Sequence, residues 1–222
     1  QDAGILIRSG DGNTVSSNLV SRGQFDGIKT EATASTNLIV GNTVWSNDLT
    51  DIVVDGQAGT QAMANRVVGN SMNGAGFGDW GVYALWAKNS VFTNNTIYGH
   101  TQVGIHGQSI FISNRIMGNT IRSNNLLGIE LFSGSAIAHT IAGNVIDGKG
   151  YQDRGIAFDG APNSVVSNNT IRGHTSDALL LNGAMTNVRI INNTVDSNDI
   201  NITISAEGFD KNRIEGNIVR RA

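Results

Sequence analysis

The sequence predicts a single all-β domain, a parallel β-helix in which short strands wind into stacked coils. Three observations carry this prediction: a short phrase recurs along the whole chain, apolar and polar residues alternate around each copy, and the composition disfavours helices. The 222 residues include 28 Gly, one Pro and no Cys, and only 15% of them are charged. Such a chain lacks the Lys- and Glu-coated surface that is typical of helical proteins.

The recurring phrase is Gly or Asn, then Asn, then usually Thr or Ser, then an aliphatic residue. Its central residues are Asn13, Asn42, Asn70, Asn95, Asn119, Asn144, Asn169, Asn193 and Asn217. A repeat of about 24 residues can bury its apolar face only by stacking on its neighbours. Asn suits a corner between strands because it tolerates left-handed backbone and can stack on an identical Asn one coil away. The nine copies predict about nine coils over residues 1–222.

The residues around each Asn predict three short strands per coil. Aliphatic residues stand three positions before and two positions after it, and a third strand follows about ten residues later, as in Gly104-Ile105 and Gly128-Ile129. Within these strands apolar and polar residues alternate, which predicts one set inside and the other facing solvent. The interval before the third strand is longer than usual in three coils, at Asn13 to Ile28, Asn70 to Val82 and Asn144 to Ile156.

The outward positions of the third strand carry the candidate site. One row contains Tyr83, His106 and Glu130, and a second row, two residues further along, contains Asp159. The turns over 73–80 and 147–154 flank this region and supply the further candidates Asp79, Trp80, Tyr151 and Arg154. Aromatic faces suit pyranose rings, and carboxylates suit sugar hydroxyls. The sequence therefore predicts a sugar-binding groove with Tyr83, Asp79, Trp80, Tyr151 and Arg154 as substrate-binding residues.

Two kinds of chemistry fit the predicted catalytic residues Glu130, Asp159 and His106. Glu130 and Asp159 could serve as the acid and base of glycoside hydrolysis. Alternatively, His106 or Tyr83 could abstract a proton from a uronic acid whose carboxylate binds Arg154, as a lyase or epimerase requires. An outward carboxylate on a β-helix is also often a solvated surface residue, so a purely structural interpretation stays open.

Charge and composition argue against several partners and cofactors. The net charge of −3 gives no field that would gather nucleic acid or an anionic membrane, and no apolar run approaches the length of a membrane span. Asp147 and Asp153 could ligate calcium, but their spacing fits neither an EF-hand nor a Gly-rich calcium repeat. The sequence therefore predicts no metal and no cofactor, with calcium as the remaining alternative.

The coil signature, seen in Asn94-Asn95-Thr96-Ile97 and Gly104-Ile105, resembles the right-handed parallel β-helix proteins of the pectin-lyase-like superfamily. The resemblance covers the whole chain and implies a right-handed helix. It leaves the activity open, because that fold includes lyases, hydrolases, epimerases, phage tailspikes and surface adhesins. The Asp-Pro-His signature of alginate epimerases is missing, since the only proline is Pro162. The acidic calcium cluster of pectate lyases and the close Asp pair of polygalacturonases are missing too.

Two functions follow as expectations. The first is a carbohydrate-active β-helix that binds and cleaves an extracellular polysaccharide as a lyase, a glycoside hydrolase or a C5-epimerase. The second is a non-catalytic shaft of a phage fibre or bacterial surface protein, which forms a homotrimer through an outward strip that contains Trp45, Tyr98, Arg122 and Arg172. Both predict a location outside the cell, on a virion or in the periplasm. Both ends also lack a polar cap, so we expect a fragment of a longer chain.

Overall fold

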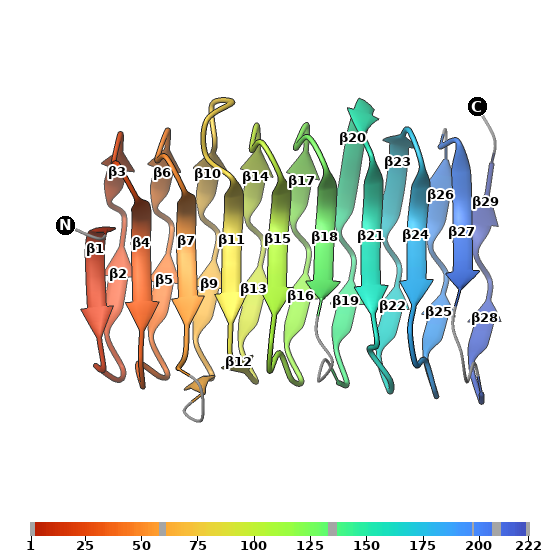
Figure 1. Ribbon diagram of the computed structural model, residues 1–222, viewed down its shortest axis with the longest axis horizontal. Coiled ribbons are helices and arrows are strands. Elements are labelled where there is room, and N and C mark those ends of the chain that lie inside the picture. The colour runs from red at the N-terminus through yellow and green to blue at the C-terminus, as the bar shows by residue number, and fades with distance from the viewer. Residues whose placement is uncertain (1–2, 58–60, 133–136, 197, 206–209, 221–222) are drawn as a thin grey trace.

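The computed structural model describes residues 3–57, 61–132, 137–196, 198–205 and 210–220, apart from the side chain of Tyr151. These residues form a parallel β-helix whose coils stack along one axis, with the N- and C-terminal coils at opposite ends (Figure 1). The part of the chain so described contains strands and turns but no helix, and therefore none that is long and apolar enough to cross a membrane.

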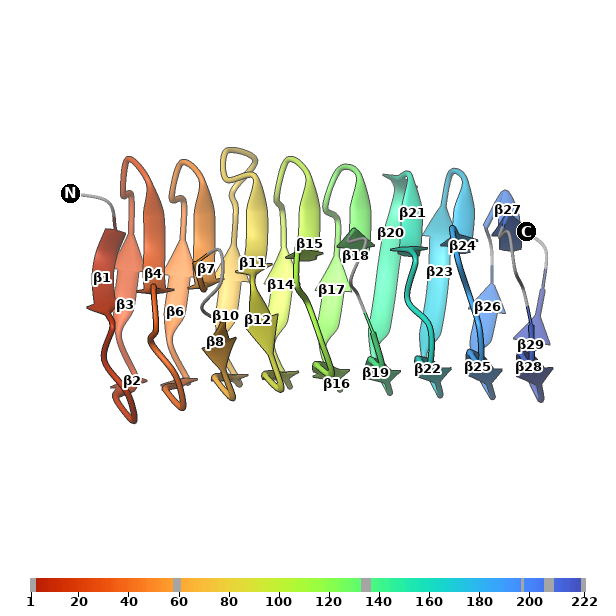
Figure 2. The same ribbon diagram turned by 60° about the horizontal axis from the view of Figure 1, so that its bottom comes forward.

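Each coil contributes one strand to each of three parallel, nine-stranded sheets, here named A, B and C (Figure 2). Sheet A contains β1 (Ala3–Arg8), β4 (Asp26–Glu31), β7 (Thr50–Asp55), β11 (Trp80–Leu85), β15 (Val103–Gln108), β18 (Leu127–Phe132), β21 (Arg154–Asp159), β24 (Asp177–Asn182) and β27 (Ile200–Ser205). Sheet B contains β2 (Thr14–Ser16), β5 (Leu38–Val40), β9 (Arg66–Val68), β13 (Val91–Thr93), β16 (Arg115–Met117), β19 (Thr140–Ala142), β22 (Val165–Ser167), β25 (Arg189–Ile191) and β28 (Arg213–Glu215). Sheet C contains β3 (Leu19–Ser21), β6 (Thr43–Trp45), β10 (Ser71–Asn73), β14 (Thr96–Tyr98), β17 (Thr120–Arg122), β20 (Val145–Gln152), β23 (Thr170–His174), β26 (Thr194–Asp196) and β29 (Ile218–Val219). A small extra pair, β8 (Ala62–Met63) and β12 (Ala87–Lys88), lies outside these sheets. The predicted all-β class with three strands per coil is confirmed.

The core is a set of aliphatic rows that run along the axis. Ile105, Ile129 and Ile156 are register partners on neighbouring strands of sheet A, and all three are fully buried. Ile121 and Ile146 form an equivalent row on sheet C. Each aliphatic residue therefore packs against the same position of the next coil, which confirms the predicted alternation between inward and outward residues.

A ladder of Asn side chains holds the corner between sheets B and C. The Oδ1 atom of Asn70 accepts the backbone N–H of Asn42 at 2.9 Å and the side-chain amide of Asn42 at 3.0 Å, and that amide also donates to the Val15 carbonyl at 2.9 Å. The same bonds link Asn18, Asn42, Asn70, Asn95, Asn119, Asn144, Asn169, Asn193 and Asn217. Buried amides are thus satisfied by the neighbouring coils.

The residue before each ladder Asn has left-handed backbone. Gly41 has a φ of 63° and Asn94 a φ of 55°. Gly and Asn adopt this conformation most readily, which explains why the repeated phrase begins with one of them. The sequence interpretation placed the left-handed conformation on the ladder Asn itself, and that assignment is wrong by one residue.

The structure also places the first copy of the phrase at a different corner from the one that the sequence predicts. Asn13 belongs to the corner that precedes sheet B, where its N–H donates to Asn37 Oδ1 at 2.8 Å, whereas Asn18 bonds to Asn42. The interval from Asn18 to Ile28 is therefore regular, and the long first turn predicted from Asn13 does not exist. The reason for this difference is that Gly12-Asn13-Thr14-Val15 has the same sequence pattern as the repeated phrase, although it lies at the other corner.

The corner between sheets C and A has a more varied set of buried residues. It carries Asn47, Gly78, His100, Asn124, Gln152, His174 and Asn198. The Nδ1 atom of His100 lies 3.0 Å from Asn124 Oδ1, and that of His174 lies 2.8 Å from Asn198 Oδ1. This corner leads directly into the strands of sheet A and therefore fixes the edge of the candidate site.

Candidate functional site

The outward face of sheet A places the predicted residues as expected. Tyr83, His106 and Glu130 are register partners on β11, β15 and β18. Phe132 is the partner of Asp159 on the next strand, so Asp159 is offset from Glu130 by one strand and two residues. The predicted outward rows are therefore confirmed, whereas the roles assigned to their members stay predictions.

Aromatic rings form a continuous surface at one end of this row. The rings of Trp80 and Tyr83 lie 5.2 Å apart, and the ring of Tyr83 stacks on that of His106 with centroids 5.4 Å apart. The Tyr83 hydroxyl donates a 2.6 Å hydrogen bond to Gln108 Oε1. Burial raises the pKa of Tyr83, and the charge of Asp55 raises it further. Tyr83 therefore stays protonated at neutral pH.

The aromatic surface ends at Glu130, the hydrogen-bond partner of His106. The Nδ1 atom of His106 lies 2.7 Å from Glu130 Oε2, in the geometry of a hydrogen bond donated to a carboxylate. The side chain of Glu130 keeps 27% of its surface exposed, against 11% for that of His106. Glu130 thus presents its carboxylate to solvent, and the more buried His106 holds the orientation of that carboxylate.

A shallow depression of about 120 Å³ lies beside Glu130. Its lining includes the predicted residues Glu130, Arg154 and Asp159 and, in addition, Leu127, Leu131, Phe132, Ala157, Phe158, Leu180 and Asn182. The predicted set of site residues omitted Phe132, Leu180 and Asn182. The alternation along β18 and β24 already places these three side chains on the outward face, and that was the signal available in the sequence.

The two long turns contribute less directly. Asp79 accepts a 2.8 Å hydrogen bond from the Thr101 hydroxyl. Arg154 binds two carboxylates, with Nε 3.2 Å from Asp177 Oδ2 and Nη1 3.3 Å from Asp153 Oδ2. Both turns project from the same edge of sheet A and flank β15 and β18 (Figure 1). The predicted contact by the Tyr151 side chain falls outside the described residues.

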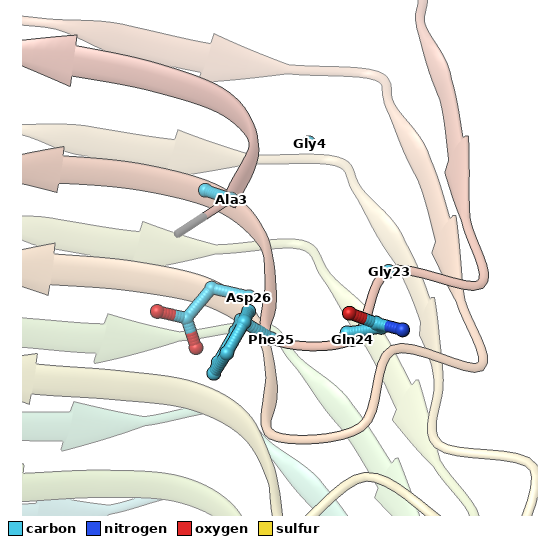
Figure 3. Close-up of a pocket in the computed structure, with 6 residues that line it drawn as sticks. All are labelled: Ala3, Gly4, Gly23, Gln24, Phe25 and Asp26. Atoms are coloured by element: carbon cyan, nitrogen blue, oxygen red, sulfur yellow. The ribbon is translucent and has the colours of Figure 1, made fainter. Parts of the chain in front are cut away.

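A larger hollow of about 260 Å³ lies against the N-terminal coil (Figure 3). Its lining consists of Ala3, Gly4, Gly23, Gln24, Phe25 and Asp26. With Asp26 as the single ionisable side chain in this lining, the hollow offers no acid–base pair, and it lies several coils away from Glu130.

Carboxylates that could hold a metal are already bound by cations. Asp147 Oδ2 lies 2.9 Å from Arg172 Nη2 and 3.3 Å from Lys149 Nζ. Burial acts to raise the pKa of the Asp147 carboxyl, but the hydrogen bonds from Lys149 and Arg172 outweigh it, so this pKa lies below its ordinary value. Within the described ranges no three His, Asp or Glu side chains come together as a metal site would require. The calcium alternative at Asp147 and Asp153 therefore gains no support.

The aromatic strip on sheet C is covered by arginines. The Arg22 guanidinium lies 5.1 Å from the ring centroid of Trp45, and that of Arg122 lies 5.0 Å from the ring of Tyr98. Such cation–π contacts stabilise exposed aromatic rings within one chain. These contacts neither require nor test the trimer interface that is predicted for this strip.

Comparison with solved structures agrees with the fold. The chain is similar to the periplasmic alginate epimerase AlgG, with a TM-score of 0.63 and 11% identity over 88% of this chain and 62% of that protein. It is also similar to PfbA, a surface adhesin of Streptococcus pneumoniae, with a TM-score of 0.70 and 12% identity over 96% of this chain and 62% of that one. The chain thus spans less than two thirds of either protein. At these identities the likeness shows the fold alone, a right-handed parallel β-helix.

A search of curated protein sequences found no relative. A protein-family model described as "Periplasmic copper-binding protein (NosD)" matches residues 73–221. This match covers more than half of the chain, and the resemblance to parallel β-helix proteins is confirmed. The chain therefore belongs to the NosD family of β-helix proteins.

Proposed function

We propose that the outward face of sheet A binds a polysaccharide and cleaves it beside Glu130. The observation that carries this proposal is the unbroken series from Trp80 through Tyr83 and His106 to Glu130, which ends at the depression shared with Asp159. Aromatic rings supply faces for pyranose rings, and the carboxylates at the end of the series supply acid–base groups. A polysaccharide substrate also agrees with a long, regular face along which sugar units can repeat.

Glycoside hydrolysis is the reaction that this arrangement supports best. One carboxyl group donates a proton to the glycosidic oxygen as the bond from that oxygen to the anomeric carbon breaks, and the other takes a proton from the water that attacks this carbon. Glu130 and Asp159 line the same depression, and His106 holds the orientation of Glu130. We assign these two carboxylates as the catalytic pair and His106 as the residue that positions Glu130.

The lyase or epimerase reaction is less well supported. It needs a base that accepts a proton at neutral pH, whereas burial raises the pKa of Tyr83. It also needs a cation for the substrate carboxylate, whereas Arg154 is already bound by Asp153 and Asp177. His106 is the remaining candidate base, and its Nδ1 atom is bonded to Glu130.

Turnover and binding by matched variants test the proposal. The purified chain is incubated with neutral, amino-sugar and uronate polysaccharides while new reducing ends and unsaturated uronates are measured. We expect reducing ends without unsaturated products, loss of turnover with retained binding in Glu130→Gln, and loss of both in Tyr83→Ala. Arg122→Gln, on sheet C, is the control and should behave as the unmodified chain. Unsaturated products would favour the lyase, and the absence of both binding and turnover would overturn the proposal.

A non-catalytic glycan-binding protein is the second candidate. The depression at Glu130 is smaller than the roughly 300 to 1,000 Å³ of most ligand pockets, which favours binding along a surface over an enclosed reaction site. In that case Tyr83→Ala would weaken binding, whereas the unmodified chain would release no reducing ends. The homotrimeric shaft stays a prediction, and its test is the molar mass in solution.

The family description names copper, and the residues present do not fit a copper site. Three of the four histidines, His100, His139 and His174, are buried in the corners of the helix, and His106 is bonded to Glu130. The described part of the chain brings no three such ligands together. We therefore derive no chemistry through a metal. We propose a periplasmic or extracellular location, where polysaccharides are found, while a virion location stays a prediction.

A further inference from the structure

The charges on the proposed site are strongly unequal. On the six strands of sheet A from β7 to β24, the partly exposed carboxylates belong to Asp55, Glu130 and Asp159, whereas Asp51 and Asp177 are buried. Against these three, the same six strands contain a single Lys or Arg, namely Arg154. A glycan that lies along this face therefore meets a negative surface.

The single arginine is not free to neutralise a ligand. Its Nε and Nη1 atoms are 3.2 Å and 3.3 Å from the carboxylates of Asp177 and Asp153. A uronate carboxylate placed in the depression would therefore face Glu130 and Asp159 without a cation of its own. Like charges that are held close together at a partly buried surface repel one another appreciably.

Two of these carboxylates lie beside the aromatic surface or in the depression: the charge of Asp55 acts on Tyr83, and Asp159 lines the depression. Asp55 Oδ1 is buried and has no hydrogen-bond partner, and burial raises the pKa of this carboxyl although the nearby Lys29 opposes the rise. Asp159 lines the depression beside the apolar side chains of Phe132 and Leu180. Between them lie the rings of Trp80 and Tyr83, whose faces attract cations as well as sugar rings.

We propose that the substrate is a polymer of hexosamines that carry free amino groups, and that uronic-acid polymers are excluded. The ammonium groups would pair with Asp159 and Asp55, and the aromatic surface would receive the sugar rings. This inference rests on the proposed function, since it names the substrate class of the same face. It separates this chain from the structurally similar alginate epimerase, with which it shares only the fold.

Binding to three oligosaccharides of equal length tests the inference: a glucosamine oligomer, its N-acetylated form and an oligouronate. We expect the glucosamine oligomer to bind about tenfold more tightly than the N-acetylated form, and the oligouronate to bind at least tenfold more weakly than either. Added salt should weaken binding of the glucosamine oligomer, leave binding of the N-acetylated form nearly unchanged, and not weaken binding of the oligouronate. Asp159→Asn and Asp55→Asn should each reduce the preference for the free amine severalfold, and the control variant Arg122→Gln, on sheet C, should leave all three affinities unchanged.

The outcomes separate this inference from the proposed function. If the oligouronate binds as tightly as the glucosamine oligomer, and Tyr83→Ala abolishes that binding, the substrate class is wrong while the site stands. Equal affinity for the glucosamine oligomer and for its N-acetylated form would also overturn the preference for free amines. If none of the three oligomers binds, the proposed function fails, and the inference fails with it.

Discussion

The two long turns, over residues 73–78 and 147–152, are the same turn built twice. Each begins with a side chain whose Oδ1 atom accepts the N–H two residues later, Asn73 for Ala75 at 2.9 Å and Asp147 for Lys149 at 3.1 Å. Each continues with a glycine that packs closely on a histidine ring of the next coil, and then with two residues in left-handed backbone. Their sequences, Asn-Gly-Ala-Gly-Phe-Gly and Asp-Gly-Lys-Gly-Tyr-Gln, preserve these roles.

The two turns differ in their last residue and in the residue that lies two coils before the buried histidine, which is Asp51 for His100 and Gly128 for His174. Gly78 has no side chain, and His100 Nε2 reaches Asp51 Oδ2 at 3.0 Å, two coils away. Gln152 occupies the equivalent position in the second turn, and neither its amide nor His174 Nε2 has a hydrogen-bond partner. Two turns of the same shape therefore leave one histidine paired with a carboxylate and the other unpaired.

The largest expected effect comes from removing the partner of His100. Asp51 stands where the neighbouring strands have Gly27 and Gly81, so Asp51→Gly restores the common residue but leaves His100 Nε2 unpaired, as His174 Nε2 already is. The substitution also removes the acceptor of the Asn47 side-chain amide, and each buried polar group left without its partner costs about 1 to 3 kcal/mol, so the total loss is about 2 to 6 kcal/mol. Urea unfolding at neutral pH measures the loss, with Asp55→Asn on the same strand as control. A loss below about 1 kcal/mol would show that the pair does not distinguish the two turns.

Acid should destabilise the protein through the two buried histidines whose Nε2 atoms have no hydrogen-bond partner. Burial lowers the pKa of His139 to about 4 and also lowers the pKa of His174. The pKa values of these histidines in the folded state lie below the unfolded value of about 6.5. Their contribution to the free energy of unfolding is therefore complete above pH 6.5 and is lost as the pH falls towards 4. For His139 the total loss is about 3 kcal/mol.

Replacing these histidines should remove that dependence. His139→Asn introduces the residue that Asn114 provides at the same corner, and His174→Asn introduces the residue that Asn124 provides at its own corner. Thermal melts of both variants between pH 7 and pH 4 should show a shallower decline than the unmodified chain, with the larger change in His139→Asn. An unchanged slope in both variants would contradict the assignment of the acid sensitivity to buried neutral histidines.

A methyl group at the first glycine tests the similarity of the two turns. A Cβ atom on Gly74 would lie 2.6 Å from the Gly99 carbonyl oxygen, and one on Gly148 would lie 2.4 Å from that of Gly173. Overpacking against backbone costs about 1 to 3 kcal/mol, so both alanine variants should unfold at clearly lower urea concentrations. Gly76→Ala, where the added atom meets open space, is the control and should lose only about 1 kcal/mol through its left-handed backbone. Unequal losses at Gly74 and Gly148 would break the equivalence of the turns.

The smallest expected effect concerns the ion pair that only the second turn has. Arg172 binds Asp147 through Nε at 3.1 Å and Nη2 at 2.9 Å, whereas the equivalent Asn73 carries no charge. Arg172→Gln should lower stability by less than about 1 kcal/mol, since the Arg172 side chain is half exposed. Added salt should erase the difference from the unmodified chain. A larger or salt-independent loss would mean that this pair, and not the backbone, holds the second turn.

The sequence predicted the fold well because one corner repeats its chemistry almost without change. Gly or Asn before Asn marks that corner in nearly every coil, and the aliphatic register of Ile121 and Ile146 follows from it. The other two corners use Asn, Ser, His, Val, Gln or Gly at the equivalent position, so no phrase reveals them. Asn13 lies at one of these corners but happens to match the phrase, and the sequence alone does not separate it from the ladder.

The sequence predicted the positions of the candidate site residues but not the contacts between their side chains. Alternation places Tyr83, His106 and Glu130 in one row, because register partners share a face. It does not show that His106 bonds to Glu130, or that Arg154 is bound by Asp153 and Asp177. Those contacts depend on rotamers and on coils about 24 residues apart, which a single sequence does not specify.

The Asn ladder has a direction. Each Asn, such as Asn119, donates through its backbone N–H and its side-chain amide to Oδ1 of the next Asn, and its own Oδ1 accepts from the previous Asn. The amide also donates to a carbonyl of the previous coil, here that of Phe92. The two faces of every coil therefore differ. A coil can therefore pair only with a neighbouring coil that has the same orientation and the same register. By the same reasoning, a whole coil inserted between Asn119 and Asn144 would join the ladder in the same register and lengthen the outward face of sheet A by one step, but it would separate Glu130 from Asp159 by one more strand.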